Sequence, residues 1–311
     1  MQPLELYIHI PFCVKKCAYC DFLSGPAGEK EKEEYVKMLV DEIRNCPDTV
    51  QNYRVISIFF GGGTPSLLTG EQIGRLMDTV REIFTLDEDA EITMEMNPGT
   101  VTEEKLRKYR QAGVNRLSIG LQSVNDEELR LLGRIHTYEE FREAYHLARA
   151  NGFSNINVDL ISAIPGQTVE SWRRTLEQVM ALFPEHISAY SLILEEGTTF
   201  YKKYVEDEAK EGPKLPDEDA ERQMYWDTET LMEKNGYLTR ESVKGDARKK
   251  RLVPTEKAEG LRQAILEDIK LSEKRMEKGI PEEDVITCKH VLYQVLQNLI
   301  EKHKEEGKKD E

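Results

Sequence analysis

The residues best suited to chemistry are three cysteines near the start of the chain. Cys13, Cys17 and Cys20 are spaced as CxxxCxxC and follow a strand-like run over residues 4–10. A single loop therefore carries three thiols at the carboxyl end of the first expected strand. Thiolates are soft ligands that select zinc or iron–sulfur clusters over hard cations. The spacing predicts a metal or cluster site in this loop.

Zinc and an iron–sulfur cluster are the two alternatives for these thiols. A structural zinc ion closes with four protein ligands, and here the fourth would have to be His9 or a distant side chain. His9 falls within the expected strand. A four-iron cluster with three cysteine ligands leaves one iron open to a cofactor or substrate. The spacing leaves both alternatives open and favours the cluster.

Polar and glycine residues also follow the later strand-like runs. Gly62 and Gly63 lie in the string FGGGTP, where glycine lets a ligand approach the backbone closely. Asp159 interrupts an apolar run, where an acid needs a partner or a ligand. Glu95 also interrupts an apolar run, and its pattern fits an ordinary exposed strand position equally well. In parallel α/β sheets functional groups gather at the carboxyl ends of strands, so these residues are expected to lie close together.

The elements that must position these residues alternate along the chain. The expected strands cover residues 4–10, 55–60, 91–96, 116–119, 155–160 and 187–192, and the helical segments cover 31–45, 70–84, 102–112, 126–150 and 168–181. Regular βα alternation predicts an α/β protein with a parallel sheet and right-handed crossovers. The pattern alone does not separate an open doubly wound sheet from a barrel.

The first cysteine segment resembles a known family. Residues 7–13 read YIHIPFC, and an aromatic residue, Tyr19, precedes the last cysteine. These features resemble the signature of radical S-adenosylmethionine (SAM) proteins, and more narrowly the coproporphyrinogen oxidase and HemW heme-chaperone group. The resemblance covers residues 4–237 and implies a partial (β/α)6 TIM-like barrel.

The resemblance also implies the cofactors and their contacts. It implies a [4Fe-4S] cluster on Cys13, Cys17 and Cys20, an electron donor for that cluster, and SAM bound to the open iron. Reductive cleavage of SAM then gives methionine and a 5′-deoxyadenosyl radical. The residues that match the family's SAM contacts are Tyr7, Tyr19, Gly62, Gly63, Thr64, Glu95, Gln122, Arg134 and Asp159. No catalytic side chain beyond these is assigned.

Two activities within this group must be separated. Coproporphyrinogen oxidases usually continue the cluster motif with a further cysteine, whereas here Cys20 is followed by Asp21 and Phe22, which resembles the heme chaperones. The favoured interpretation is a protein that binds heme and transfers it to an acceptor protein. The alternatives are an oxygen-independent coproporphyrinogen III oxidase, an oxidoreductase acting on a porphyrinogen, and a non-catalytic barrel with a partner-binding tail.

The last quarter of the chain departs from the group. Residues 1–237 carry 26 basic and 42 acidic side chains, while residues 238–311 carry 17 and 16. The shift predicts a domain boundary near Tyr237. The segment from 238 on is expected to be a charged helical tail, with amphipathic helices over 261–269 and 291–299 forming a hairpin and a basic run at 248–251 acting as a solvated linker. The segment that the heme chaperones of this group associate with heme is therefore not recognisable in this chain.

Charge and hydropathy argue against nucleic acid and a membrane as partners of this protein. The formal net charge is −15 over 311 residues, which argues against nucleic acid as the main partner. No run approaches the ~20 apolar residues of a membrane helix, and the chain begins directly with strand-like sequence. A cytoplasmic protein without an integral membrane segment is therefore expected.

Overall fold

A six-stranded parallel sheet forms the centre of the first compact unit, Met1–Asn235. The computed structural model describes residues 1–207, 212–234, 238–243 and 246–254. All six expected strands are confirmed. Strands that follow one another in the chain are also neighbours in the sheet. They are β1 (Gln2–Ile10), β2 (Tyr53–Gly62), β3 (Thr85–Met96), β4 (Arg116–Gln122), β5 (Ile156–Ser162) and β6 (His186–Ser191).

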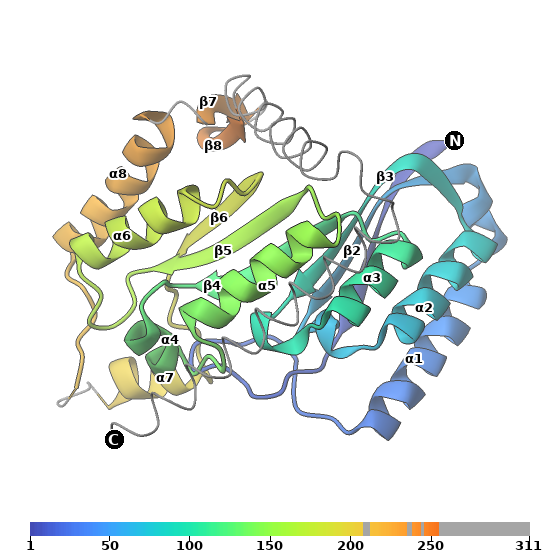
Figure 1. Ribbon diagram of the computed structural model, residues 1–311, viewed down its shortest axis with the longest axis horizontal. Coiled ribbons are helices and arrows are strands. Elements are labelled where there is room, and N and C mark those ends of the chain that lie inside the picture. Colours follow the sequence, from blue (N-terminus) through green and yellow to red (C-terminus); the bar gives the residue numbers. More distant parts are fainter. Residues whose placement is uncertain (208–211, 235–237, 244–245, 255–311) are drawn as a thin grey trace, which may run out of the picture. The chain divides into compact units, whose positions relative to one another are not determined.

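Helices connect the successive strands. Figure 1 shows α1, α2, α3 and α5 side by side along one face of the sheet. Right-handed crossovers between strands in sequential order put every helix on the same face, whereas a doubly wound sheet reverses its order and covers both faces. The sheet is therefore a half-barrel, which confirms the predicted partial TIM-like fold. The helices are α1 (Glu29–Arg44), α2 (Gly70–Ile83), α3 (Glu103–Ala112), α4 (Asp126–Leu132), α5 (Tyr138–Ala150) and α6 (Val169–Met180).

Capping residues fix where the outer helices begin. At the start of α2 the Thr69 side chain accepts a hydrogen bond from the Gln72 backbone, and the Gln72 side chain accepts one from the Thr69 backbone. Thr137 and Glu140 do the same for α5. Such reciprocal caps satisfy backbone donors that a helix start leaves unpaired. The apolar face of α2 is buried as its spacing predicts, at Ile73, Leu76, Met77 and Val80.

The single helix expected over 126–150 is wrong. The chain forms α4 and α5, separated by residues 133–137. Gly133 ends α4 with a φ of 79°, a left-handed conformation that glycine adopts without a steric penalty, and Thr137 caps the next helix. The break carries Arg134 out of the helix and toward the ends of the strands, where the candidate site lies.

The chain continues beyond β6 through short elements. Helix α7 (Thr199–Tyr201) runs directly into a π-helix (Lys202–Glu206), and α8 (Glu218–Lys234) closes the first unit. Trp172 of α6 is fully buried and donates its indole N–H to Met224 O and Thr228 Oγ1 of α8. None of the described helices is long and apolar enough to cross a bilayer.

The described part of the tail is a β-hairpin. Strands β7 (Leu238–Val243) and β8 (Asp246–Pro254) pair antiparallel. The basic run 248–251 lies within β8, so the prediction that it is a linker is wrong. Its neighbour Leu252–Pro254 pairs with Leu238–Arg240, which places the run in a ladder of main-chain hydrogen bonds. The two helices expected over 261–269 and 291–299 lie outside the described residues.

Candidate functional site

The three-cysteine loop between β1 and α1 is held by main-chain hydrogen bonds to several segments. Cys13 N donates to Gly25 O at 2.9 Å, which closes the loop on itself. Ala18 N donates to Leu132 O at the end of α4, and Phe200 N donates to Ala18 O, both at 2.9 Å. The loop is therefore fixed to α4 and α7 by its backbone, leaving its side chains available for other contacts.

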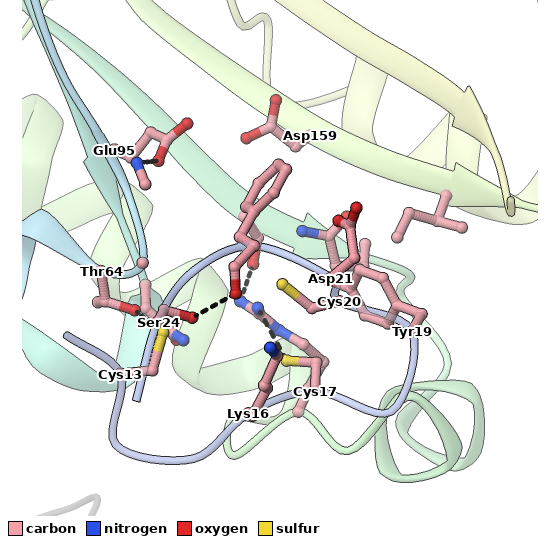
Figure 2. A pocket seen from close by; sticks show the side chains of 18 of the residues that line it. Cys13, Lys16, Cys17, Tyr19, Cys20, Asp21, Ser24, Thr64, Glu95 and Asp159 are labelled. Carbon is pink, nitrogen blue, oxygen red and sulfur yellow. Dashed lines mark hydrogen bonds between the residues drawn. The ribbon is translucent and has the colours of Figure 1, made fainter. Parts of the chain in front are cut away.

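The loop borders a cavity of about 410 Å³ at the carboxyl ends of the strands. Figure 2 shows the three thiols on one side of this cavity and Glu95 and Asp159 across from them. The lining brings together eleven of the twelve predicted site residues, namely Cys13, Cys17, Tyr19, Cys20, Gly62, Gly63, Thr64, Glu95, Gln122, Arg134 and Asp159.

Tyr7 is the predicted site residue that does not line this cavity. Its side chain is 60% exposed and its hydroxyl is hydrogen-bonded to His9 Nδ1 at 3.0 Å. The other ring nitrogen of His9 lies 3.2 Å from Leu23 O of the cysteine loop. Tyr7 therefore contacts the cysteine loop indirectly, through the ring of His9.

The glycine turn after β2 brings backbone groups to the cavity wall. Gly63 N donates to Ile10 O at 2.9 Å, and a Cβ at Gly63 would stand 2.6 Å from Phe12 O. Gly62 has a φ of 115°, which side chains other than hydrogen rarely allow. Thr64 follows, with its hydroxyl 3.5 Å from Cys13 Sγ. Glycine is thus required here by both packing and backbone geometry.

Glu95 on β3 is a partly buried carboxyl with one main-chain donor. Its Oε2 accepts a hydrogen bond from Gly62 N at 3.0 Å. Burial raises the pKa of Glu95 from 4.5 to about 7; the Gly62 bond opposes this rise and the Asp159 carboxyl adds to it. A carboxyl of this kind is stabilised in its charged form by a cationic ligand such as an ammonium group.

Asp159 on β5 lies within a hydrogen-bond network of three strands. Ser118 Oγ donates to Asp159 Oδ2 at 2.9 Å, and Asn157 Nδ2 donates to Oδ1 at 2.7 Å. Asn157 Oδ1 in turn accepts from Ser188 Oγ. Burial raises the pKa of Asp159, and the Ser118 and Asn157 donors oppose that rise. The network orients the carboxyl toward the cavity and partly offsets its desolvation.

Arg134 joins the cysteine loop to the end of β4. Its Nη2 donates to Gly120 O at 2.6 Å, and its Nη1 lies 3.7 Å from Cys17 Sγ. Its Nε is buried and has no hydrogen-bond partner among the described residues. Gln122 ends β4 with a φ of 78°, next to a register shift in the β4–β5 pairing. Arg134 itself lines the cavity, so its positive charge is available to an acceptor bound there.

The donor set fits a thiolate-bound cluster. Burial raises the pKa of the Cys20 thiol and the neighbouring cysteines add to the rise, while a main-chain hydrogen bond at Phe22 and, to a smaller extent, the charge of Lys16 oppose it. Arg134 adds a second positive charge beside Cys17. Among the described residues no three His, Cys, Asp or Glu side chains converge on one ion position. The thiols of a cubane bind three different irons, so they need not converge on one point.

Several lining residues were missed by the sequence interpretation. Ser118 and Asn97 are examples, and Asn97 Oδ1 is buried without a partner among the described residues. Ser118 lies two positions before Gly120 on β4, so the alternation of the strand was a usable signal. Residues from β6 and its exit also line the cavity, namely Tyr190, Ser191, Leu192, Ile193 and Glu195.

A parallel half-barrel with a three-thiol loop at the carboxyl ends of its strands defines a class of cofactor-binding α/β barrels. The model for the radical SAM superfamily matches residues 7–179 of this chain, and the chain belongs to that superfamily. Members of this family use a [4Fe-4S] cluster and SAM, and the cavity brings together residues chemically suited to both.

Curated relatives and a solved structure show which members of the superfamily this chain resembles. The heme chaperone HemW of Escherichia coli (strain K12) is 43% identical over 238 residues, which cover 76% of this chain and 61% of that protein. A second relative, from Danio rerio, is radical S-adenosyl methionine domain-containing protein 1, mitochondrial. It is 35% identical over 235 residues, which cover 75% of this chain and 52% of that protein. The structure of the Escherichia coli radical SAM enzyme coproporphyrinogen III oxidase (HemN) matches with a TM-score of 0.71 and 30% identity, covering 84% of this chain and 58% of that one. This chain therefore spans half to three fifths of these proteins.

Proposed function

We propose that this chain binds a [4Fe-4S] cluster and SAM in its cavity and acts as a heme chaperone of the HemW type. The observation that carries the proposal is a single cavity lined by three thiols of one loop and by two partly buried carboxyls of raised pKa, Glu95 and Asp159. Thiolates suit iron, and carboxyls of this kind suit an amine-bearing polar ligand. One cavity thus offers complementary chemistry to both cofactors.

The chain's own residues divide the binding of SAM between them. Glu95 and the backbone at Gly62 and Gly63 take the amine of its methionine moiety, while Arg134 takes the carboxylate as a bidentate cation. Gln122 and Asp159 hydrogen-bond the ribose or adenine. A bound cluster supplies the single electron that SAM cleavage needs, and an external electron donor reduces it. The role of these residues is to orient SAM and exclude water.

The heme-chaperone role rests on the curated relatives and on the residues after Cys20. The heme chaperone HemW of Escherichia coli is 43% identical over the matched part. Asp21 and Phe22 follow Cys20 where coproporphyrinogen oxidases usually have a further cysteine. Heme would then be transferred to an acceptor protein. No heme ligand is assigned, because the tail after Tyr237 departs from the pattern of these chaperones.

Cluster binding is tested by replacing one cysteine of the loop. Cys17→Ser should remove the absorbance and electron paramagnetic resonance (EPR) signal of the anaerobically reconstituted cluster, because an alcohol is a poor ligand for iron. Cys46→Ser is the matched control: Cys46 lies outside the cavity, with its thiol 3.8 Å from Glu42 O. Full cluster content in Cys17→Ser would contradict the assignment.

Heme binding is tested by titrating heme into cluster-loaded protein and following its absorbance. Saturation at one heme per chain, followed by transfer to an apo-hemoprotein acceptor, is the expected result. A folded, cluster-loaded protein that shows no saturable heme binding would exclude the chaperone role for this chain. The SAM site would survive that outcome, because its residues lie on the barrel.

An oxygen-independent coproporphyrinogen III oxidase is the second candidate. The observation in its favour is the TM-score of 0.71 to an enzyme of that name, at 30% identity. The two functions differ in one assay, SAM-dependent decarboxylation of coproporphyrinogen III under anaerobic conditions with an added reductant. We expect no decarboxylation above the Cys17→Ser background, and turnover would place the oxidase first.

A further inference from the structure

A buried carboxylate outside the cavity connects the exits of β4 and β5, the two strands that carry Gln122 and Asp159 of the site. Glu128, in the first turn of α4, is 5% exposed and does not line the cavity. It accepts hydrogen bonds from three side chains: Ser123 Oγ at 2.6 Å, Gln167 Nε2 at 2.8 Å, and Ser171 Oγ. We call these four residues the Glu128 cluster. A buried charge is tolerated only where such donors satisfy it.

The donors come from segments far apart in the sequence. Ser123 directly follows the end of β4, Gln167 lies in the turn after β5, and Ser171 lies in the first turn of α6. Ser123 also accepts a bond from Asn125 N at 3.0 Å, and Gln167 Oε1 accepts one from Ile164 N at 3.4 Å. One carboxylate thereby fixes the backbone of both strand exits.

Both strand exits contain a non-glycine residue in the left-handed region. Gln122, next to Ser123, has a φ of 78°, and Ala163, next to Ile164, has a φ of 59°. Residues other than glycine occupy this region only where the surroundings over-determine the backbone. The Glu128 cluster supplies hydrogen bonds on the adjoining residue at each exit, so it accounts for how two strained residues persist.

Apolar packing extends this link to the cysteine loop. Leu132 of α4, Ile161 and Ile164 of the β5 exit, and Phe200 form a buried cluster, against which Ala18 and Tyr19 pack. The Glu128 cluster ties α4 to the β5 exit, so it holds the two sides of this apolar cluster together. Arg134 lies directly after α4, and its N–H donates to Leu129 O of that helix.

From these contacts we infer that Glu128 is a positioning residue, which sets the geometry of Gln122, Arg134 and the β5 exit for SAM without touching SAM itself. The inference rests on the proposed SAM site and adds a residue to it. No local sequence pattern marks this role, since Glu128 reads as one of three acids in the first turn of a helix. Its function depends on partners up to 43 residues away.

The test compares Glu128→Gln with Glu127→Gln, an exposed neighbour in the same turn, in cluster-loaded protein. Glutamine keeps the size of the side chain but cannot accept all three bonds. We expect Glu128→Gln to retain its cluster and to bind SAM about tenfold or more weakly, with a reduced SAM-induced change in the EPR spectrum. Glu127→Gln should match the wild type. A SAM affinity within twofold of the wild type would overturn the inference.

Two further measurements keep the inference testable. Ser171→Ala removes one donor and leaves the carboxylate in place, so it should weaken SAM binding less than Glu128→Gln does. Hydrogen exchange at Asn125 and Ile164 should quicken in Glu128→Gln while β2 stays protected, and unchanged exchange there would overturn the inference. If the wild type itself binds no SAM, the proposed function fails, and the exchange result still decides whether Glu128 orders the two exits.

Discussion

The two sides of the cavity are built by different means. One side, the glycine wall, consists of Gly62, Gly63 and Glu95 from the ends of β2 and β3. It presents backbone groups and the Glu95 carboxyl, and its shape depends on the absence of side chains at Gly62 and Gly63. The other side, the polar wall, consists of Gln122, Arg134 and Asp159. It presents side chains, and those of Arg134 and Asp159 are held by hydrogen bonds to β4.

This difference determines how strongly a substitution in each wall affects the protein. It also determines how much of each wall can be predicted from the sequence. The glycine wall tolerates no added atom, because a Cβ at Gly63 would meet main-chain atoms of Phe12 and a Cβ at Gly62 would meet the His9 ring. The polar wall can lose a single bond and keep its others, because its groups share donors and acceptors. Substitutions in the glycine wall should therefore have the larger effects, and those in the polar wall should be graded.

Gly63→Ala should produce the largest effect. The added Cβ would stand 2.6 Å from Phe12 O, and Gly63 N is held to Ile10 O, so the strain falls on backbone that cannot easily move. We expect a loss of about 3 kcal/mol in the free energy of unfolding, measured by denaturant titration, with poor cluster retention.

Gly74→Ala is the matched control for that substitution. Gly74 lies within α2 and a Cβ there meets nothing within 4 Å. Alanine is the better helix former by about 1 kcal/mol, so this variant should be as stable as the wild type or more stable. If the two alanine variants had equal stability, the close approach at the glycine wall would not be what requires glycine.

The glycine wall was predictable from the sequence because its signal is local. The string FGGGTP at the end of an expected strand pointed to Gly62 and Gly63, and Glu95 stood out as an acid in an apolar run. The presence of six parallel strands followed from their alternation with helices. What the pattern could not supply was closure, since the same alternation fits an open sheet and a half-barrel until the strand order is known.

The polar wall was only partly predictable, because its geometry comes from contacts between distant residues. The sequence indicated Asp159 but not its donor Ser118, which is 41 residues away. The break between α4 and α5 was missed because apolar residues continue at helical spacing across Gly133. The hairpin of β7 and β8 was missed for a related reason: its basic residues resembled a solvated segment, and pairing between strands leaves little trace in charge.

The charge of Glu95 should carry the next largest effect. Its pKa in the folded protein, about 7, lies above the value of 4.5 for an unburied glutamate, so the folded state binds this proton more tightly. The stability it contributes is full below pH 4.5 and is lost as the pH rises through 7, by about 3 kcal/mol at most. Glu95→Gln should therefore be more stable than the SAM-free wild type at pH 8 and equal to it at pH 4.

Glu95→Gln should also separate stability from binding. The amine of SAM favours the charged carboxylate, so wild-type affinity should fall as the pH drops below 7, and the variant should bind weakly at every pH. Unfolding curves and equilibrium binding at pH 5, 6, 7 and 8 measure both properties. A pH-independent affinity in the wild type would show that Glu95 does not face the amine.

Arg134→Lys tests whether the polar wall depends on a planar cation. Arg134 bonds Gly120 O with one nitrogen and approaches Cys17 Sγ with another, and a lysine cannot make both contacts. We expect a cost of about 1–2 kcal/mol in unfolding free energy and weaker SAM binding. Arg130→Lys, on the exposed side of α4, should change stability by less than about 0.5 kcal/mol. Equal effects of the two substitutions would remove Arg134 from the site.

The smallest effect should come from Ser118→Ala, which removes one donor from Asp159 and one acceptor from Asn157 Nδ2, while the bond from Asn157 to Asp159 stays in place. Losing one hydrogen bond of a shared set costs about 1 kcal/mol, which corresponds to about a fivefold weaker affinity for SAM. Ser162→Ala is the comparison on β5, because its hydroxyl bonds Tyr190 O and not Asp159. It should lower stability slightly and leave SAM affinity unchanged. If Ser118→Ala instead abolished binding, the polar wall would behave like the glycine wall, and the graded character inferred from its shared hydrogen bonds would be wrong.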